Sequence, residues 1–243
     1  MRFSLVLPVY NEAKILEDSV DKVRKTLDDI DVDYEIIIAE DGSTDGTDKI
    51  AARLAKKYKK IRFIHHDRKL GRGRAFTIAA KRARGDVIGF MDADLATGVD
   101  FLKDLVKYSK KYDVVTGSRY VPGAKIQRPP VREFVSRAYN ALIRLALGVE
   151  LYDSQCGFKA FSRRFVENEL DKIKENTWAW DAVALVHAIK TGYSFKEFPV
   201  SWRERKEAAH SASMSRIMND VKIHGNVVVK MFLKWRMKLP VKI

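Results

Sequence analysis

The feature that most constrains the fold is the alternation of short apolar runs with amphipathic segments over the first 120 residues. The apolar runs occupy residues 3–10, 34–40, 61–66, 86–94 and 112–120, and the segments between them carry apolar residues at helical spacing. Continuous Val/Ile runs that alternate with helices indicate a mostly parallel sheet covered on both faces. Ligands of such sheets bind beyond the carboxyl ends of the strands. We therefore predict an α/β fold, flanked by helices, with its site at that edge.

The second half of the chain has a different texture. Residues 121–130 form a loop with three prolines, residues 131–147 have the pattern of an amphipathic helix closed by Gly148, and residues 178–192 predict another helix. Short strands are expected within 152–164 and 195–205. From residue 213 to 238, apolar residues recur at helical spacing among basic ones. We expect one catalytic domain at 1–207 and a basic amphipathic helical tail at 208–243.

The net charge of +14 is concentrated in the second half. Residues 1–122 hold 24 Lys/Arg against 20 Asp/Glu, whereas residues 123–243 hold 22 against 12. Such a half suits nucleic acid, acidic lipid or phosphorylated substrates, and composition alone does not choose among them. The single cysteine excludes an intramolecular disulfide and a cysteine-based zinc site.

Targeting signals are not apparent in the sequence. No secretory signal and no run of 18 apolar residues is visible, so we expect a cytoplasmic protein without a transmembrane segment. The basic tail suits peripheral docking on the cytoplasmic face of a membrane. The alternative, that the tail packs on the domain, stays open.

Asp92 and Asp94 are the first candidate site residues, because they end the apolar run 86–94. Residues two apart in a strand point to one face, so the two carboxylates should converge. Carboxylates a few Å apart repel unless a cation or proton lies between them, and Mg²⁺ or Mn²⁺ suits such hard oxygen ligands. The alternative is that the acids cap the next helix or mark a turn.

Polar groups also follow three other predicted strands. The first ends in Pro8-Val9-Tyr10-Asn11-Glu12, the second in Glu40-Asp41-Gly42-Ser43, and the fifth in Gly117-Ser118-Arg119-Tyr120. Carboxylates such as Glu40 and Asp41 can accept hydrogen bonds from ribose hydroxyls or a base edge. The GRGRAF segment could approach phosphate through backbone N–H groups, although a glycine motif alone is weak. The four strand ends together predict a ligand site.

The motifs VLPVYNE, EDGSTDGT, DADLAT and GSRY, in this order and spacing, resemble the catalytic domain of family 2 glycosyltransferases, whose fold is called GT-A. The resemblance covers roughly residues 3–205. Within the family, the chain is most similar to polyprenyl-phosphate sugar synthases, and DADLAT, DSQCGFKAF and WAWD are closer to the dolichyl-phosphate glucosyltransferases. This implies an inverting, metal-dependent hexosyltransferase that moves glucose from UDP-glucose onto dolichyl or polyprenyl phosphate. Mannose from GDP-mannose and a saccharide acceptor stay open as alternatives.

The resemblance also implies roles for individual residues. Asp94 would bind Mg²⁺ or Mn²⁺, and Asp92 would lie near the ribose, the diphosphate or the metal. Two departures from the family pattern are Ala96, where many relatives have Gln, and Glu40, where many have Asp. The residues expected around the nucleotide are Pro8, Tyr10, Glu12, Ile38, Glu40, Asp41, Asp92 and Ala93.

A phosphate acceptor would need a cationic cradle rather than a general base. A phosphomonoester has a second pKa of about 6 and is largely dianionic at neutral pH, so it is already a nucleophile. Arg119 beside the acids is expected to be catalytic together with Asp92 and Asp94. The expected acceptor-phosphate residues are Arg119, Arg132, Ser136, Arg203 and Arg205, and the expected sugar and acceptor pocket is Asp153, Gln155, Trp180 and Asp181. A hydroxyl acceptor would instead need a base, with Asp181 as the first candidate; nucleic acid is not an expected partner.

Overall fold

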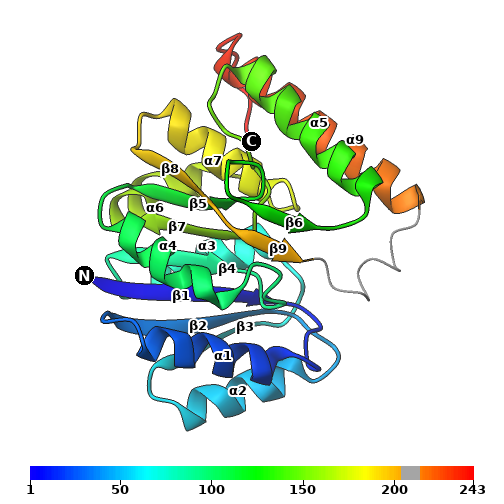
Figure 1. The fold of residues 1–243 in the computed structure, drawn as a ribbon. Coiled ribbons are helices and arrows are strands. Elements are labelled where there is room, and N and C mark those ends of the chain that lie inside the picture. Colours follow the sequence, from blue (N-terminus) through cyan, green and yellow to red (C-terminus); the bar gives the residue numbers. More distant parts are fainter. Residues whose placement is uncertain (204–213) are drawn as a thin grey trace.

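A seven-stranded sheet forms the centre of the computed structural model, which describes residues 1–203 and 214–243, without the side chains of 214–220 (Figure 1). The strand order is β3-β2-β1-β4-β7-β5-β8. β7 is antiparallel to both of its neighbours, and the other pairs are parallel. The mostly parallel α/β sheet is therefore confirmed. The strands are β1 (Arg2–Val9), β2 (Asp33–Asp41), β3 (Ile61–His66), β4 (Val87–Met91), β5 (Val114–Ser118), β7 (Phe158–Ser162) and β8 (Phe195–Pro199).

Helices cover both faces of this sheet, as the continuous apolar runs predict. Within β1, Val6 belongs to one buried cluster while Leu5 and Leu7 belong to another, so side chains on both faces of the strand are buried. The helices are α1 (Leu16–Asp28), α2 (Thr47–Lys57), α3 (Arg72–Arg82), α4 (Leu102–Ser109), α6 (Arg163–Glu169) and α7 (Trp180–Lys190), with 3-10 turns η1 (Val99–Phe101) and η2 (Leu170–Lys172).

A small second sheet and one helix follow β5. The strands β6 (Lys125–Gln127) and β9 (Ser201–Arg203) pair in parallel, and α5 (Pro130–Leu147) ends at Gly148, which is left-handed with φ 61° as a glycine cap requires. The single strand expected within 195–205 is broken between β8 and β9. Pro199 ends β8, because proline has no N–H to continue the ladder.

The C-terminal helix α9 (Met214–Trp235) packs on the domain with one face. Val227, Val228 and Met231 are buried in the same cluster as α7, and the Trp235 ring lies 5.6 Å from the His187 ring. α5 and α9 run side by side at one end of the molecule, opposite α1 and α2 (Figure 1). The predicted boundary between residues 207 and 208 lies outside the described residues. In the part of the chain that the structure describes, no helix is long and apolar enough to cross a membrane.

Candidate active site

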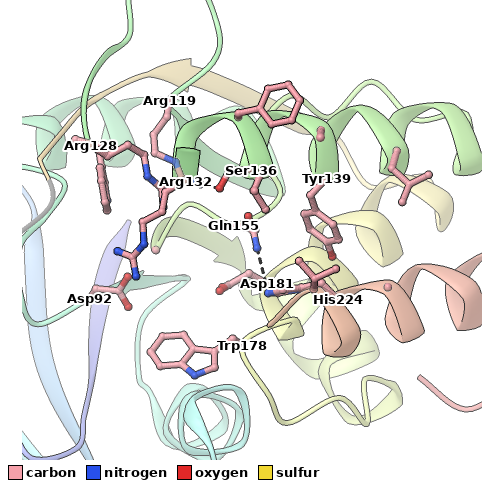
Figure 2. A pocket seen from close by; sticks show the side chains of 18 of the residues that line it. Asp92, Arg119, Arg128, Arg132, Ser136, Tyr139, Gln155, Trp178, Asp181 and His224 are labelled. Carbon is pink, nitrogen blue, oxygen red and sulfur yellow. Dashed lines mark hydrogen bonds between the residues drawn. The ribbon is translucent and has the colours of Figure 1, made fainter. Parts of the chain in front are cut away.

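A cavity of about 680 Å³ opens between the carboxyl edge of the sheet and helices α5 and α9 (Figure 2). Its polar end is lined by three acids and four arginines. Its other end lies between α5 and α9 and is lined by apolar side chains. The cavity brings together seven residues predicted from the sequence: Asp92, Asp94, Arg119, Arg132, Ser136, Gln155 and Asp181.

Asp92 and Asp94 reach the cavity from a turn and not from a strand. β4 ends at Met91, the backbone N–H of Leu95 donates to the Asp92 carbonyl at 3.1 Å, and Leu95 has a φ of 53°. The strand predicted to run to residue 94 is therefore three residues too long. The N–H of Ala96 donates to Oδ1 of Asp94 at 3.0 Å, which orients that carboxylate. Both acids line one cavity, as predicted, but the turn and not strand alternation brings them there.

Four buried or half-buried charges lie behind this turn. Arg72 donates from Nη1 to Oδ1 of Asp92 at 2.7 Å and from Nη2 to Asp181. Lys159 donates to the other Asp181 oxygen at 2.5 Å. Burial, and after it the charge of Arg72, lowers the pKa of Lys159 to about 7. The network therefore links Asp92 to the interior.

Arg119 lines the cavity but is also half of a buried ion pair. Its Nε and Nη2 donate to the two carboxylate oxygens of Asp153 at 2.7 and 2.8 Å, and its backbone N–H donates at 2.9 Å. Burial opposes the charge of Arg119, but the Asp153 charge and hydrogen bonds outweigh it, so the pKa of Arg119 is raised. Asp153 is fully buried and does not line the cavity. Its visible role is to fix the guanidinium at the cavity wall.

The residues predicted around the nucleotide lie at the ends of β1, β2 and β4. Glu40 is fully buried, and its carboxylate accepts hydrogen bonds from the Ser43 N–H and interacts with His65 Nδ1, both at 2.5 Å. Asp41 accepts from the backbone N–H groups of Leu70 and Gly71 at 2.7 and 2.9 Å. Both acids therefore organise loops of the chain itself.

The remaining nucleotide candidates differ in exposure. Ile38 is fully buried, Ala93 is 4% exposed, and Pro8 and Glu12 are partly buried. Tyr10 is 37% exposed, and the Lys69 ammonium lies 3.7 Å from its ring centroid. Tyr10 is therefore the most exposed of these candidates, and the Lys69 ammonium covers part of its ring.

Three other predicted residues lie away from the cavity or outside the described chain. Trp180 is 2% exposed and packs against Phe76 and Phe90 in the core. Arg203 donates to Oε1 of Gln127 at 2.7 Å on the small sheet, and it does not line the cavity. Arg205 lies outside the described residues.

Sequence reasoning missed several residues that build the site. Arg72 stands in the GRGRAF segment, where only the glycines drew attention, and Arg128 follows the proline-rich loop. Trp178 is 64% exposed, lines the cavity and covers the Arg72 guanidinium with its ring at 4.7 Å. His224 comes from α9, and its Nε2 lies 3.2 Å from Nε2 of Gln155 (Figure 2). Among these residues, only Arg72 could have been noticed from the sequence, because it is a basic residue inside the GRGRAF segment.

The acid pair fits a divalent cation only with help from other ligands. Among the described residues, no three His, Cys, Asp or Glu side chains cluster as a metal site would require. Asp92 and Asp94 offer hard carboxylate oxygens at the same cavity wall, which is the chemistry that Mg²⁺ or Mn²⁺ prefers. Oxygens of a diphosphate and of water would have to complete the shell. The residues therefore fit a metal bound together with its nucleotide.

Relatives with related sequences point the same way. The chain is 46% identical over 206 residues to Glycosyltransferase AglD of Haloferax volcanii, which covers 83% of the chain and 33% of AglD. It is 32% identical over 214 residues to Dolichyl-phosphate beta-glucosyltransferase ALG5C of Trichomonas vaginalis, covering 83% of the chain and 64% of ALG5C. The chain thus spans one third to just under two thirds of the length of these relatives.

Solved structures share the fold at low identity. Glucosyl-3-phosphoglycerate synthase of Mycobacterium tuberculosis, in complex with UDP, matches with a TM-score of 0.69 and 20% identity, over 96% of the chain and 79% of the synthase. Mannosyltransferase PcManGT of Pyrobaculum calidifontis, in complex with GDP-Man and Mn²⁺, matches with a TM-score of 0.63 and 19% identity, over the whole chain and 66% of PcManGT. With the strand order described above, they confirm the GT-A-like fold.

The family follows from a match over more than half of the chain. The family model described as glycosyl transferase family 2 matches residues 4–170, from β1 to the start of η2. This range includes the turn with Asp92 and Asp94, Arg119 and most of the cavity wall. The chain belongs to glycosyl transferase family 2.

Proposed function

We propose that the chain is an inverting, metal-dependent hexosyltransferase that moves glucose from UDP-glucose onto dolichyl or polyprenyl phosphate. The observation that carries the proposal is the polarity of the cavity. Acids and arginines line one end, and Phe134, Leu142 and Val221 line the other, between α5 and α9. A phosphate attached to an isoprenoid chain has the same division into a charged and an apolar part.

In this proposal the arginines bind the acceptor phosphate. Arg119 and Arg132 line the polar end, and Ser136 follows Arg132 by one helical turn, where its hydroxyl accepts a hydrogen bond from Arg128 at 3.0 Å. Guanidinium groups bind phosphate oxygens through parallel N–H donors. Holding the phosphate near the anomeric carbon lowers the entropic part of the barrier. A dianionic phosphate attacks without a general base.

The state of Asp181 supports a phosphate acceptor over a saccharide. Asp181 is 1% exposed, and its two oxygens contact Arg72 and Lys159. A carboxylate paired with two cations is a poor proton acceptor, because both charges favour its ionised form. The residue first considered as a base for a hydroxyl acceptor is therefore badly placed for that role.

Asp94 and Asp92 would hold the divalent cation in this scheme. When bound, the cation would offset the negative charge that develops on the departing diphosphate. The chain's own contribution is to fix both carboxylates on one turn at the polar end of the cavity. Mn²⁺ in the PcManGT complex is consistent with this requirement but does not choose between Mg²⁺ and Mn²⁺.

Glucose is favoured over mannose by the named relatives. ALG5C and ALG5A of Trichomonas vaginalis are both named dolichyl-phosphate beta-glucosyltransferases. The test is to incubate the chain with labelled UDP-glucose or GDP-mannose, a short polyprenyl phosphate, and Mg²⁺ or Mn²⁺. We expect labelled lipid from UDP-glucose, with β configuration, and none after chelation of the metal. Absence of labelled lipid with every donor would refute the proposal, and a label only from GDP-mannose would correct the sugar.

The same two helices are proposed to dock the domain on the cytoplasmic face of a membrane. α5 exposes Val131, Phe134, Leu142 and Leu145, and α9 exposes Val221, Val229 and Phe232, each set at helical spacing. Exposed lysines at 222 and 230 accompany them on α9. Apolar side chains with basic neighbours suit the boundary of an acidic bilayer. The segment 208–243 thus serves the catalytic domain at 1–207 both as packing and as a docking element.

Flotation with vesicles tests this docking. Leu145→Glu and Val229→Glu change side chains that do not line the cavity, and each should weaken binding to phosphatidylcholine vesicles containing phosphatidylserine about tenfold or more, because an apolar group no longer enters the bilayer boundary. Lys59→Glu, an exposed position near β3 at the far end, is the control and should bind nearly as well as the unmodified chain. Equal binding by all variants would exclude this face.

A further inference from the structure

Residues far apart in the sequence hold the Asp92 carboxylate in place. We call Arg72, Gly157 and Lys159 together the Asp92 seat. Arg72 from α3 donates to its Oδ1 at 2.7 Å, and the backbone N–H of Asp92 donates to the Gly157 carbonyl at 3.0 Å. Asp92 itself is partly exposed, with 35% of its side chain accessible, whereas Arg72 has 16%. Arg72, Gly157 and the carboxylate that they hold all line the cavity wall.

Gly157 provides the space for this carboxylate. A Cβ built on Gly157 would overlap Oδ2 of Asp92 and crowd its Cγ. Gly157 is not in the left-handed region, so its backbone would accept alanine, and the three atoms nearest to the added Cβ all belong to Asp92. The glycine of the DSQCGFKAF segment is thus required by the position of one side chain.

Arg72 is itself fixed on several sides. Its guanidinium lies 4.7 Å from the Trp178 ring and 5.0 Å from the Phe90 ring, and its second nitrogen contacts Asp181. Lys159, which is fully buried, contacts Asp181 from β7 at 2.5 Å. The network contains two acids and two bases, whose mutual attraction and hydrogen bonds offset part of the cost of burying them.

We propose that Gly157, Arg72 and Lys159 are positioning residues of the transfer reaction, which seat the Asp92 carboxylate toward the donor. Gly157 gives room for Oδ2, Arg72 holds Oδ1, and Lys159 acts through Asp181. This inference rests on the proposed function, because it concerns the donor side of the same site. Displacing a reacting or ligating group by about 1 Å can cost about 100-fold in rate.

Gly157→Ala is the sharpest test, because it removes no functional group. We expect kcat/KM for the donor to fall about 10- to 100-fold, with a higher Mn²⁺ concentration needed for half-maximal rate and little change in the KM of the acceptor. Gly98→Ala is the matched control. Gly98 has a φ of −57°, and the nearest atom to an added Cβ lies at 3.7 Å, so its activity should stay near that of the unmodified chain.

Arg72→Lys separates geometry from charge. Lysine keeps one positive charge but cannot bridge two carboxylates, so it should lose nearly as much donor kcat/KM as Arg72→Gln. Full rescue by lysine would show that charge alone matters and would overturn the seat. Lys159→Met should give a smaller loss in the same parameters. The melting temperature of each variant, without ligand, shows whether it folds.

A binding measurement keeps this inference distinct from the proposed function. The stabilisation of the chain by UDP with Mn²⁺ in a thermal-shift titration reports the seat without any turnover. We expect Gly157→Ala to shift this titration to higher Mn²⁺, whereas Gly98→Ala should not. If the unmodified chain makes no labelled lipid, the proposed function fails but this comparison still stands. Unchanged Mn²⁺–UDP binding and unchanged donor kinetics in a folded Gly157→Ala chain would refute the seat.

Discussion

Replacing Asp94 with asparagine is expected to lower kcat/KM for sugar transfer by about 10³-fold, because an electrostatic contribution of several kcal/mol to the departing diphosphate is lost. Asn has nearly the same shape as Asp, and its amide oxygen can still accept the hydrogen bond that the Ala96 N–H donates at 3.0 Å. The turn after β4 should therefore survive, while the second carboxylate needed for a divalent cation is gone.

Initial rates at saturating Mg²⁺ and at saturating Mn²⁺ measure this loss, and the melting temperature measures folding. The control is Asp31→Asn, since Asp31 is exposed in the turn before β2, far from the cavity. It removes one carboxylate without touching the site, and its rate should stay within about twofold, as surface substitutions have small effects. Full activity in a folded Asp94→Asn chain would remove Asp94 from the metal site and leave Asp92 alone.

The sheet could largely be predicted because its signals are local. Runs such as residues 34–40 carry their own evidence for a buried strand, and the structure has β2 at Asp33–Asp41. The place of β7 could not be predicted in this way. β7 lies between β4 and β5 and runs antiparallel to both, although about 40 residues separate it from β5. Strand order depends on contacts distant in sequence, which a run of five residues does not encode by itself.

The site residues also divide into those with a local sequence signal and those brought together by contacts distant in sequence. Asp92, Asp94 and Arg119 follow predicted strands, and the common edge of the sheet brings them together. Arg72 and Asp181 are 109 positions apart, and only the packing of α3 against α7 makes them partners. Such a pair leaves no periodic pattern in the sequence.

The two tryptophans at the start of α7 show a second limit. Trp180 is buried at 2% exposure and Trp178 is 64% exposed, although they are two residues apart in the same segment. Trp180 is the first residue of α7 and its ring enters the core, whereas Trp178 lies in the turn that precedes the helix. Trp180 is predicted from the sequence to lie in the pocket, whereas it packs on Phe76 in the core and Trp178 lines the cavity.

Replacing Asp153 with asparagine is expected to reduce the free energy of unfolding by about 3–5 kcal/mol. The change leaves Arg119, 7% exposed, without the carboxylate that accepts from its Nε and Nη2. An uncompensated buried charge costs far more than the lost hydrogen bonds. For a chain of this length the melting temperature should fall by about 10 °C.

The double variant Arg119→Met with Asp153→Asn separates the structural role of Arg119 from its role in binding. It removes both charges, and the new amide side chain at position 153 would still offer an oxygen to the backbone N–H of residue 119, which donates to Asp153 at 2.9 Å. Most of the lost stability should therefore return, since a buried ion pair can often be replaced by uncharged groups at little cost. Denaturant unfolding of the three chains measures this recovery.

The KM for polyprenyl phosphate should nevertheless rise about 10- to 100-fold, because one charge-assisted contact to the phosphate is missing. Restored stability with an unchanged acceptor KM would assign Arg119 to folding alone and would move the phosphate cradle to Arg128 and Arg132.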